Sequence, residues 1–220
     1  MNFFKIVFLV LLSLIKVSNQ QCLMKGVCEK KSFGIVPCEF NGPPEPLLDN
    51  DAKEVMNEIC PHLASEDALC CDKDQIFEMK RSFEISGLFL KICPSCFLNY
   101  GKVFCHLYCS AKQNTFLKVL NTTKGEDGKN QVDEVTYFVN VGFANDVYYS
   151  CQSVTRHGLK IIDVFCKPWS AEKCNYQRML NYMGADETHF GRHPFQVDFI
   201  FVNTMTINEE NETFTANVRM

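Results

Sequence analysis

The chain has 220 residues, of which 46% are hydrophobic and 19 are phenylalanine, and this content is sufficient for one domain with a proper core. Its formal net charge is -4, and its lysines and arginines are scattered along the sequence. Because nucleic-acid binding needs clustered positive charge, this composition excludes nucleic acid as a partner.

The N-terminal residues predict a secretory signal peptide. Lys5 supplies one positive charge, and an apolar stretch from Ile6 to Ile15 leads into the polar run from Lys16 to Gln21. The apolar part has about ten residues, whereas a membrane-spanning helix needs roughly 20. We therefore expect residues 1–20 to be a cleaved signal peptide and residues 21–220 to form one exported domain.

Thirteen cysteines, all between Cys22 and Cys174, suit an oxidising compartment and predict disulfides. The sequons Asn121-Thr122-Thr123 and Asn211-Glu212-Thr213 predict glycosylation at Asn121 and Asn211, because a signal peptide would bring them to the compartment where this modification occurs.

The first predicted elements are an extended segment and a short helix. Residues 22–48 contain three cysteines and the turn-forming run 41–44 but no helical period, so we expect an extended, cross-linked segment. A helix is predicted to begin at Asp49 or Asn50 and to stop before Pro61, because Val55, Met56 and Ile59 recur at the spacing of one helical face.

Two further helices are predicted before residue 110. Asp72 and Gln75 have the spacing of a capping box and precede an apolar pattern that predicts a helix from about Lys73 to Phe83. The next helix is predicted after Pro94 with Ser95 as its cap. Its aromatic residues recur at three- and four-residue steps, namely Phe97, Tyr100, Phe104 and Tyr108.

The second half of the chain mixes strands and helices. Residues 124–130 predict a polar loop, and the alternation at Val135, Tyr137 and Val139 predicts a strand. Helices are predicted over 144–154 and 175–183, and a mostly buried strand over 195–202. This mixture predicts an α+β fold.

The motif Cys93-Pro94-Ser95-Cys96 has the spacing of a redox pair and of half a zinc site, with Cys105 and Cys109 as the other half. A redox pair usually opens a helix after a buried strand in a βαβ unit, which this sequence does not offer. Zinc thiolates compete poorly with oxidation in the secretory pathway. Structural disulfides are favoured over these two alternatives, and we predict no metal.

No pattern of catalytic residues stands out. A Cys-His catalyst needs a low-pKa thiol beside an imidazole, and no local partner marks any of the five histidines. Hydrolase, zinc-protease and phosphate-binding motifs are absent from the sequence. We predict that the chain is not an enzyme and needs no cofactor. The histidines are His62, His106, His157, His189 and His193.

Six short motifs carry a resemblance to a known family: GPPEPL at 42–47, ICP at 59–61, LCCDKDQ at 69–75, CPSCFLN at 93–99, FCHLYCS at 104–110 and GFAN at 142–145. Their order and spacing, with the vicinal pair Cys70-Cys71, resemble the lumenal N-terminal sterol-binding domain of the Niemann-Pick type C1 membrane proteins. The resemblance covers nearly the whole mature chain and weakens after Met183.

The resemblance implies mixed helices and a small sheet around a deep apolar pocket that holds one sterol with its hydroxyl innermost. In that family a glutamine at the position of Gln75 bonds the hydroxyl. Further lining positions correspond to Met24, Met79, Phe104, Pro194, Phe195 and Val197. The family's second hydroxyl contact is an asparagine, and here that position is Pro37, which has no side-chain donor or acceptor. We therefore expect weaker or broader sterol binding.

The resemblance also implies six disulfides and one unpaired cysteine. The implied pairs are Cys22–Cys70, Cys28–Cys38, Cys60–Cys105, Cys71–Cys109, Cys96–Cys151 and Cys166–Cys174. The family partner of Cys93 belongs to a cluster that would lie beyond Met220, so Cys93 is expected to be unpaired in a fragment or short relative of a larger membrane protein.

The function implied is non-catalytic sterol binding and transfer, in the lumen of endosomes or lysosomes or outside the cell. Implied partners are a sterol, a soluble carrier like Niemann-Pick type C2 and a downstream sterol-sensing membrane portion. One alternative is a protein-interaction ectodomain that has lost tight sterol binding. Another is a thiol oxidoreductase that uses Cys93 and Cys96.

Overall fold

The computed structural model describes residues 20–125 and 127–203. Its fold is α+β, as predicted, with a five-stranded sheet in the order β1-β2-β4-β3 and with β7 paired to β4. Adjacent strands are antiparallel except β4 and β7, which run parallel. The bounds are β1 Cys22–Lys31, β2 Gly34–Gly42, β3 Leu117–Lys124, β4 Asn130–Asn140 and β7 Gln196–Val202.

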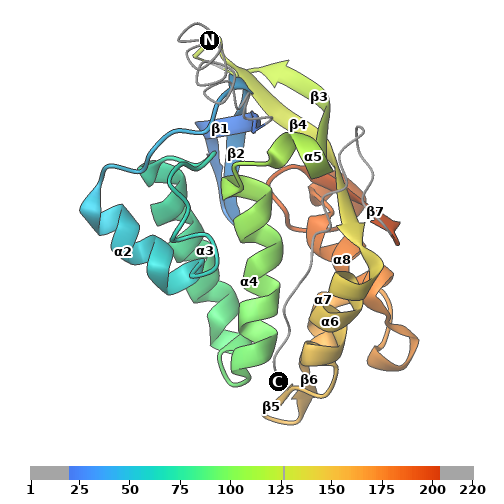
Figure 1. Cartoon of the computed structure of the whole chain (residues 1–220). Coiled ribbons are helices and arrows are strands. Elements are labelled where there is room, and N and C mark those ends of the chain that lie inside the picture. The colour runs from blue at the N-terminus through green and yellow to red at the C-terminus, as the bar shows by residue number, and fades with distance from the viewer. Residues whose placement is uncertain (1–19, 126, 204–220) are drawn as a thin grey trace, which may run out of the picture.

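The helices form two groups (Figure 1). One group contains α2 Asn50–Ile59, α3 Lys73–Leu90 and α4 Pro94–Cys109, and the other contains α6 Val141–Gln152, α7 Ile161–Phe165 and α8 Tyr176–Gly184. The groups meet where α4 packs against α6. The short elements are α5 Gln113–Phe116, β5 Thr155–Arg156, β6 Leu159–Lys160, η1 Ala171–Lys173 and η2 Glu187–His189.

The predicted helix starts match the capping seen in the structure at α2 and α3. Asp49 accepts a hydrogen bond from the Ala52 amide, and Asp72 and Gln75 form the predicted capping box. The segment predicted as extended over 22–48 is largely the β1–β2 hairpin. The loop predicted over 124–130 connects β3 to β4, with the Gly125 amide donating to the Lys129 carbonyl.

The predicted end of α3 is wrong, because the helix continues from Phe83 to Leu90. Beyond Phe83 the residues on both sides of the helix are apolar, and this obscures the helical period. The predicted cap at Ser95 is also wrong. Cys93 is the N-cap residue, and Pro94 occupies the first turn, where its fixed φ suits a helix start.

Six disulfides join twelve of the cysteines, with Cα–Cα distances of 4.5–6.0 Å. Their partners are the same as in the pairs that the family resemblance implies. Cys93 is free, whereas Cys96 is bonded to Cys151, so these two residues do not form a redox pair. Within 20–125 and 127–203, no group of three or more metal-binding side chains is placed to hold an ion.

None of the helices in the described part of the chain is long and apolar enough to cross a membrane.

The hydrophobic core lies between the sheet and the helices. Val132, Val135 and Tyr137 of β4 are buried, and they belong to the same hydrophobic cluster as Met79 of α3 and Leu107 of α4.

The contact between α8 and β7 yields a stability prediction. A Cβ added at Gly184 would lie 2.5 Å from the Val197 carbonyl oxygen, so Gly184→Ala forces two backbones apart. We expect a loss of about 2–3 kcal/mol in the free energy of unfolding, measured by urea denaturation with the disulfides intact. Gly101→Ala is the control, because its Cβ meets the Phe83 ring and the Ile59 carbonyl only at ordinary contact distances. Equal stability of the two variants would contradict the prediction.

Candidate functional site

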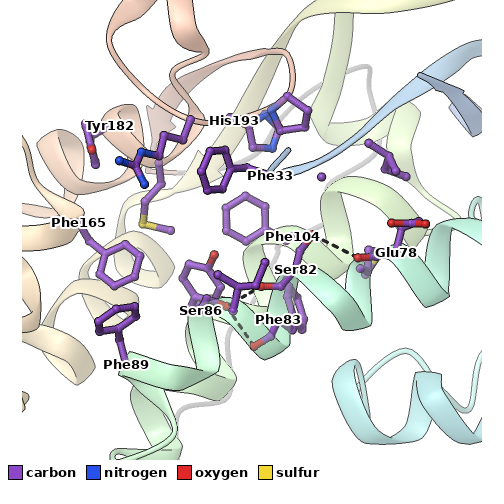
Figure 2. Close-up of a pocket in the computed structure, with 18 of the residues that line it drawn as sticks. Phe33, Glu78, Ser82, Phe83, Ser86, Phe89, Phe104, Phe165, Tyr182 and His193 are labelled. Carbon is purple, nitrogen blue, oxygen red and sulfur yellow. Dashed lines mark hydrogen bonds between the residues drawn. The ribbon is translucent and has the colours of Figure 1, made fainter. Parts of the chain in front are cut away.

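A cavity of about 290 Å³ lies between α3, α4, the β1–β2 turn, the α7 region, α8 and the loop before β7. Figure 2 shows aromatic rings converging on it from several of these elements. Eight Phe and Tyr residues line the cavity: Phe33, Phe83, Phe89, Phe104, Phe165, Tyr100, Tyr108 and Tyr182. Small-molecule sites are typically concave and mostly apolar, so this cavity is the candidate site.

Helical periodicity explains much of the lining. Met79, Ser82 and Ser86 lie on successive turns of α3, and Tyr100, Phe104 and Tyr108 lie four residues apart on α4. Side chains at such spacing share one face of a helix, so each helix presents a continuous row of side chains to the cavity.

The rings of the wall pack against one another. Tyr100 lies 5.0 Å from Phe104 and 5.9 Å from Phe165, measured between ring centroids. His193 stacks on Phe104 at 5.8 Å. Aromatic rings at these separations hold each other in place, so much of the wall exists before any ligand enters.

The tyrosine and histidine side chains that line the cavity carry no charge at neutral pH. Burial raises the pKa of Tyr100 to about 12 and lowers the pKa of His193 to about 4. His193 Nδ1 lies 2.6 Å from the Phe195 carbonyl oxygen and donates to it when neutral. Ser86 Oγ lies 3.3 Å from the Phe83 carbonyl oxygen, to which it donates. The polar groups inside are therefore hydroxyls and one neutral imidazole.

Three charged residues line the cavity: Glu78, Lys167 and Arg192. The Glu78 carboxylate contacts Lys30 Nζ at 2.5 Å and Arg81 at 3.8 Å, so its charge is balanced. Lys167 and Arg192 are exposed, and neither forms an ion pair within the described residues. The charge on the cavity lining is thus positive and lies on exposed residues.

The structure brings three of the predicted lining residues together. Met79, Phe104 and Pro194 all line the cavity. Phe195 is buried and does not line it, but its ring lies 6.1 Å from that of Tyr108, which does. Met24 and Val197 are buried in β1 and β7 and do not line it either.

Gln75 is completely buried one helical turn before Met79 and does not line the cavity. Its Oε1 accepts from the amides of Gly26 at 2.7 Å and Asp72 at 3.1 Å. These two bonds identify the other amide atom as Nε2, which has no hydrogen-bond partner among the described residues. A buried donor without a partner costs about 1–3 kcal/mol, and such an atom needs an explanation.

Several residues that line the cavity were not predicted from the sequence to do so. Tyr100 and Tyr108 were visible only as members of a helical period. Phe165, Tyr182 and His193 had no local signal, because they reach the cavity from α7, α8 and the loop before β7. Their roles depend on chain segments that only tertiary packing brings together.

The predicted glycosylation sites and signal peptide lie only partly within the described residues. Asn121 is exposed on β3, and Thr123 Oγ1 donates to Asp133 Oδ1 at 3.1 Å. Asn211 and the predicted signal peptide, apart from Gln20, lie outside the described residues.

A hydrogen bond from Ser95 lowers the pKa of the free Cys93 thiol.

Comparison with known proteins places these observations in a family. A family model described as Niemann-Pick C1 N terminus matches residues 19–220. NPC intracellular cholesterol transporter 1 of Sus scrofa is 33% identical over 207 residues, which is 90% of this chain and 16% of that protein. Its homolog 1 in Caenorhabditis elegans is 29% identical over 182 residues, with 74% of this chain and 13% of that protein covered.

A third relative is NPC1-like intracellular cholesterol transporter 1 of Homo sapiens, 29% identical over 171 residues, with 74% of this chain and 12% of that protein covered. The chain therefore spans at most 16% of the length of each of these three relatives.

The half-buried His193 predicts a dependence of stability on pH. Its folded pKa of about 4 lies below the unfolded value of 6.5, so the unfolded chain binds more protons as the pH falls through 6.5. The stabilisation is present above pH 6.5 and is lost toward pH 4, by up to about 2 kcal/mol at pH 5. Urea denaturation between pH 7 and pH 4.5 measures this loss.

His193→Asn keeps a donor near the Phe195 carbonyl and removes the titration, so its stability should fall less steeply over this range. His157→Asn, at an exposed turn with positive φ that asparagine tolerates, is the matched control. The assignment to His193 is wrong if the two variants show the same pH slope.

Proposed function

Since the chain belongs to the Niemann-Pick C1 N-terminal family, we propose that it binds one sterol in the aromatic cavity and serves intracellular cholesterol transport without catalysing a reaction. The observation that carries this proposal is a largely apolar cavity of about 290 Å³ whose wall is held by ring contacts. The printed names of its relatives as cholesterol transporters support the substrate class.

The energetics favour a rigid apolar ligand. Burial of ~400 Å² of sterol hydrocarbon provides roughly 10 kcal/mol before the costs of association. The cavity lies at the lower end of the usual range of about 300–1,000 Å³ for ligand sites, so side chains must move to admit a whole sterol. Met79 and Met183 line it, and methionine adapts readily to the shape of a ligand.

We propose that Gln75 forms the hydrogen bond to the sterol hydroxyl at the inner end of the ligand. Its unpaired Nε2 is a buried donor, and a sterol hydroxyl oxygen is an acceptor that would satisfy it. Met79 stands one turn further along the same helix and lines the cavity. Displacement of the Met79 side chain would extend the cavity toward Gln75.

The cellular setting follows as part of the proposal. Six disulfides and the exposed sequon at Asn121 suit a lumenal or extracellular location, in endosomes or lysosomes or at the cell surface. We propose a soluble Niemann-Pick type C2-like carrier as sterol donor and a sterol-sensing membrane portion as acceptor.

One observation favours a second candidate function. Pro37 is buried in β2 opposite Val27 and offers no side-chain hydrogen bond. A domain that keeps the fold but has lost tight sterol binding would act as a protein-interaction module. Mass spectrometry of the protein secreted from cells distinguishes the two, because a bound sterol supports the first function and its absence supports the second.

The role of Gln75 is tested by sterol binding to purified protein. Gln75→Ala removes the donor, and we expect sterol affinity to fall by about 1–3 kcal/mol, or roughly fivefold to more than a hundredfold. Gln75→Glu retains an acceptor for the Gly26 and Asp72 amides and should also weaken binding, which separates the donor from the capping box. A radiolabelled sterol measures both.

Tyr100→Phe is the matched control, because it removes a hydroxyl that belongs to the cavity lining itself. If Tyr100→Phe weakens binding and Gln75→Ala does not, the hydroxyl anchor is Tyr100 and the assignment to Gln75 fails. Thermal unfolding of each variant with its disulfides intact verifies that the fold is retained.

A further inference from the structure

The second half of α3 carries an exposed apolar stripe in addition to its buried one. Ile85, Leu88 and Phe89 are 45%, 61% and 42% exposed, and Ile92, just beyond the helix, is 60% exposed. These positions follow the i, i+3, i+4, i+7 spacing of one helical face. Phe83 and Leu90 on the inner face are buried. A surface helix normally has one apolar stripe, so the second requires its own explanation.

This stripe is continuous with the mouth of the cavity. Ile85 and Phe89 belong both to the stripe and to the cavity lining. Two other lining residues, Phe33 and Val164, are 43% and 37% exposed. We call the set Phe33, Ile85, Leu88, Phe89, Ile92 and Val164 the collar. Contiguous apolar surface of this kind usually marks an interaction site.

Three cations adjoin the collar. Lys91 lies between Phe89 and Ile92 in the sequence, and its Nζ lies 5.5 Å from the centroid of the Phe97 ring on α4. The Arg192 guanidinium lies 5.0 Å from the centroid of the Phe33 ring. Lys167 lines the cavity beside Val164. Over 20–125 and 127–203, none of these three has an ion-pair partner.

Acidic groups in the same region are largely engaged. Glu78 is balanced by Lys30 and Arg81, and Asp163 accepts a hydrogen bond from the Ala171 amide at 2.6 Å. Glu84 is exposed on α3 and interacts electrostatically with Lys80. The collar is therefore an apolar surface with positive charge at its border.

We infer that the collar docks on a lipid bilayer that carries anionic lipids. Exposed aliphatic and aromatic side chains enter the interfacial region of a bilayer, and lysine and arginine beside them bind anionic headgroups. The choice of a bilayer also rests on the proposed function, since a cavity that opens on its docking surface can exchange lipid directly with it. β3, which carries Asn121, lies at the other end of the molecule from the α3–α4 turn (Figure 1), so a glycan there would leave the collar free.

Vesicle sedimentation with the full chain, expressed through the secretory pathway, tests this inference. Vesicles contain phosphatidylcholine alone or with added phosphatidylserine, and no sterol. We expect binding that needs phosphatidylserine and weakens at high salt. Leu88→Ser combined with Ile92→Ser should reduce vesicle affinity about tenfold, and Lys91→Gln should reduce it about fivefold.

The matched control is Leu48→Ser. Leu48 is 82% exposed and borders a hollow with Asp72 and Lys73, at the opposite end of α3 from the collar. This variant should bind vesicles as the unmodified chain does. Leu88 and Ile92 do not line the cavity, so their double variant should keep its sterol affinity and its thermal stability.

Unchanged vesicle binding of the Leu88 and Ile92 double variant overturns the inference. If that variant also no longer receives sterol from a soluble carrier protein, the collar is a protein-docking surface. Failure of the proposed function is distinguishable, since vesicle binding is measured without sterol and sterol affinity is measured without vesicles.

Discussion

The vicinal cysteines before α3 tie this helix to β1 and to α4. Cys70 is bonded to Cys22 at the start of β1, and Cys71 is bonded to Cys109 at the end of α4. The Cys70 amide also donates to the Cys109 carbonyl at 3.0 Å. The first turn of α3 is thereby joined to a strand and to the second helix of the cavity wall, so α3 and α4 cannot separate at this end. Cross-links of this type stabilise the folded chain mainly by lowering the conformational entropy of the unfolded chain. This stabilisation helps the aromatic cavity wall to remain folded when no ligand fills it.

That arrangement gives the two ends of the cavity different chemistry. Gln75, with its buried unpaired donor, lies one helical turn beyond the lining at the end near the capping box. The tyrosine and histidine side chains of the lining are uncharged at neutral pH. The open end has apolar side chains in solvent and the cations Lys167 and Arg192. A ligand with one hydroxyl and a long rigid hydrocarbon body fits this polarity, because a buried hydroxyl must be hydrogen-bonded and the hydrocarbon must leave water.

The start of α3 could be predicted from local sequence, but its end could not. Its start was predictable because a capping box is a local pattern of Asp72 and Gln75. Its end was not, because Ile85, Leu88 and Phe89 add apolar residues to the side that faces away from the core. A single-sequence period cannot distinguish a buried apolar face from an exposed one, and the same feature that hid the helix end forms the collar at the cavity mouth.

The class of fold and the starts of α2, α3, α8 and β7 could be predicted from the sequence alone, whereas β3 and α7 were not predicted. The cysteine pattern carried the family resemblance that implied the pairs seen in the structure. These depend on spacing within a few residues or on ordered motifs along the chain. Which side chains reach the cavity depends instead on tertiary packing. Met79, Phe104 and Pro194 do, while Met24, Phe195 and Val197 are buried away from its lining and Gln75 lies one turn beyond it. A position in a family motif predicts the helix or strand on which a residue lies and the face that it occupies. The boundary of a cavity depends on how side chains from several distant segments pack together, and no local sequence pattern indicates that packing.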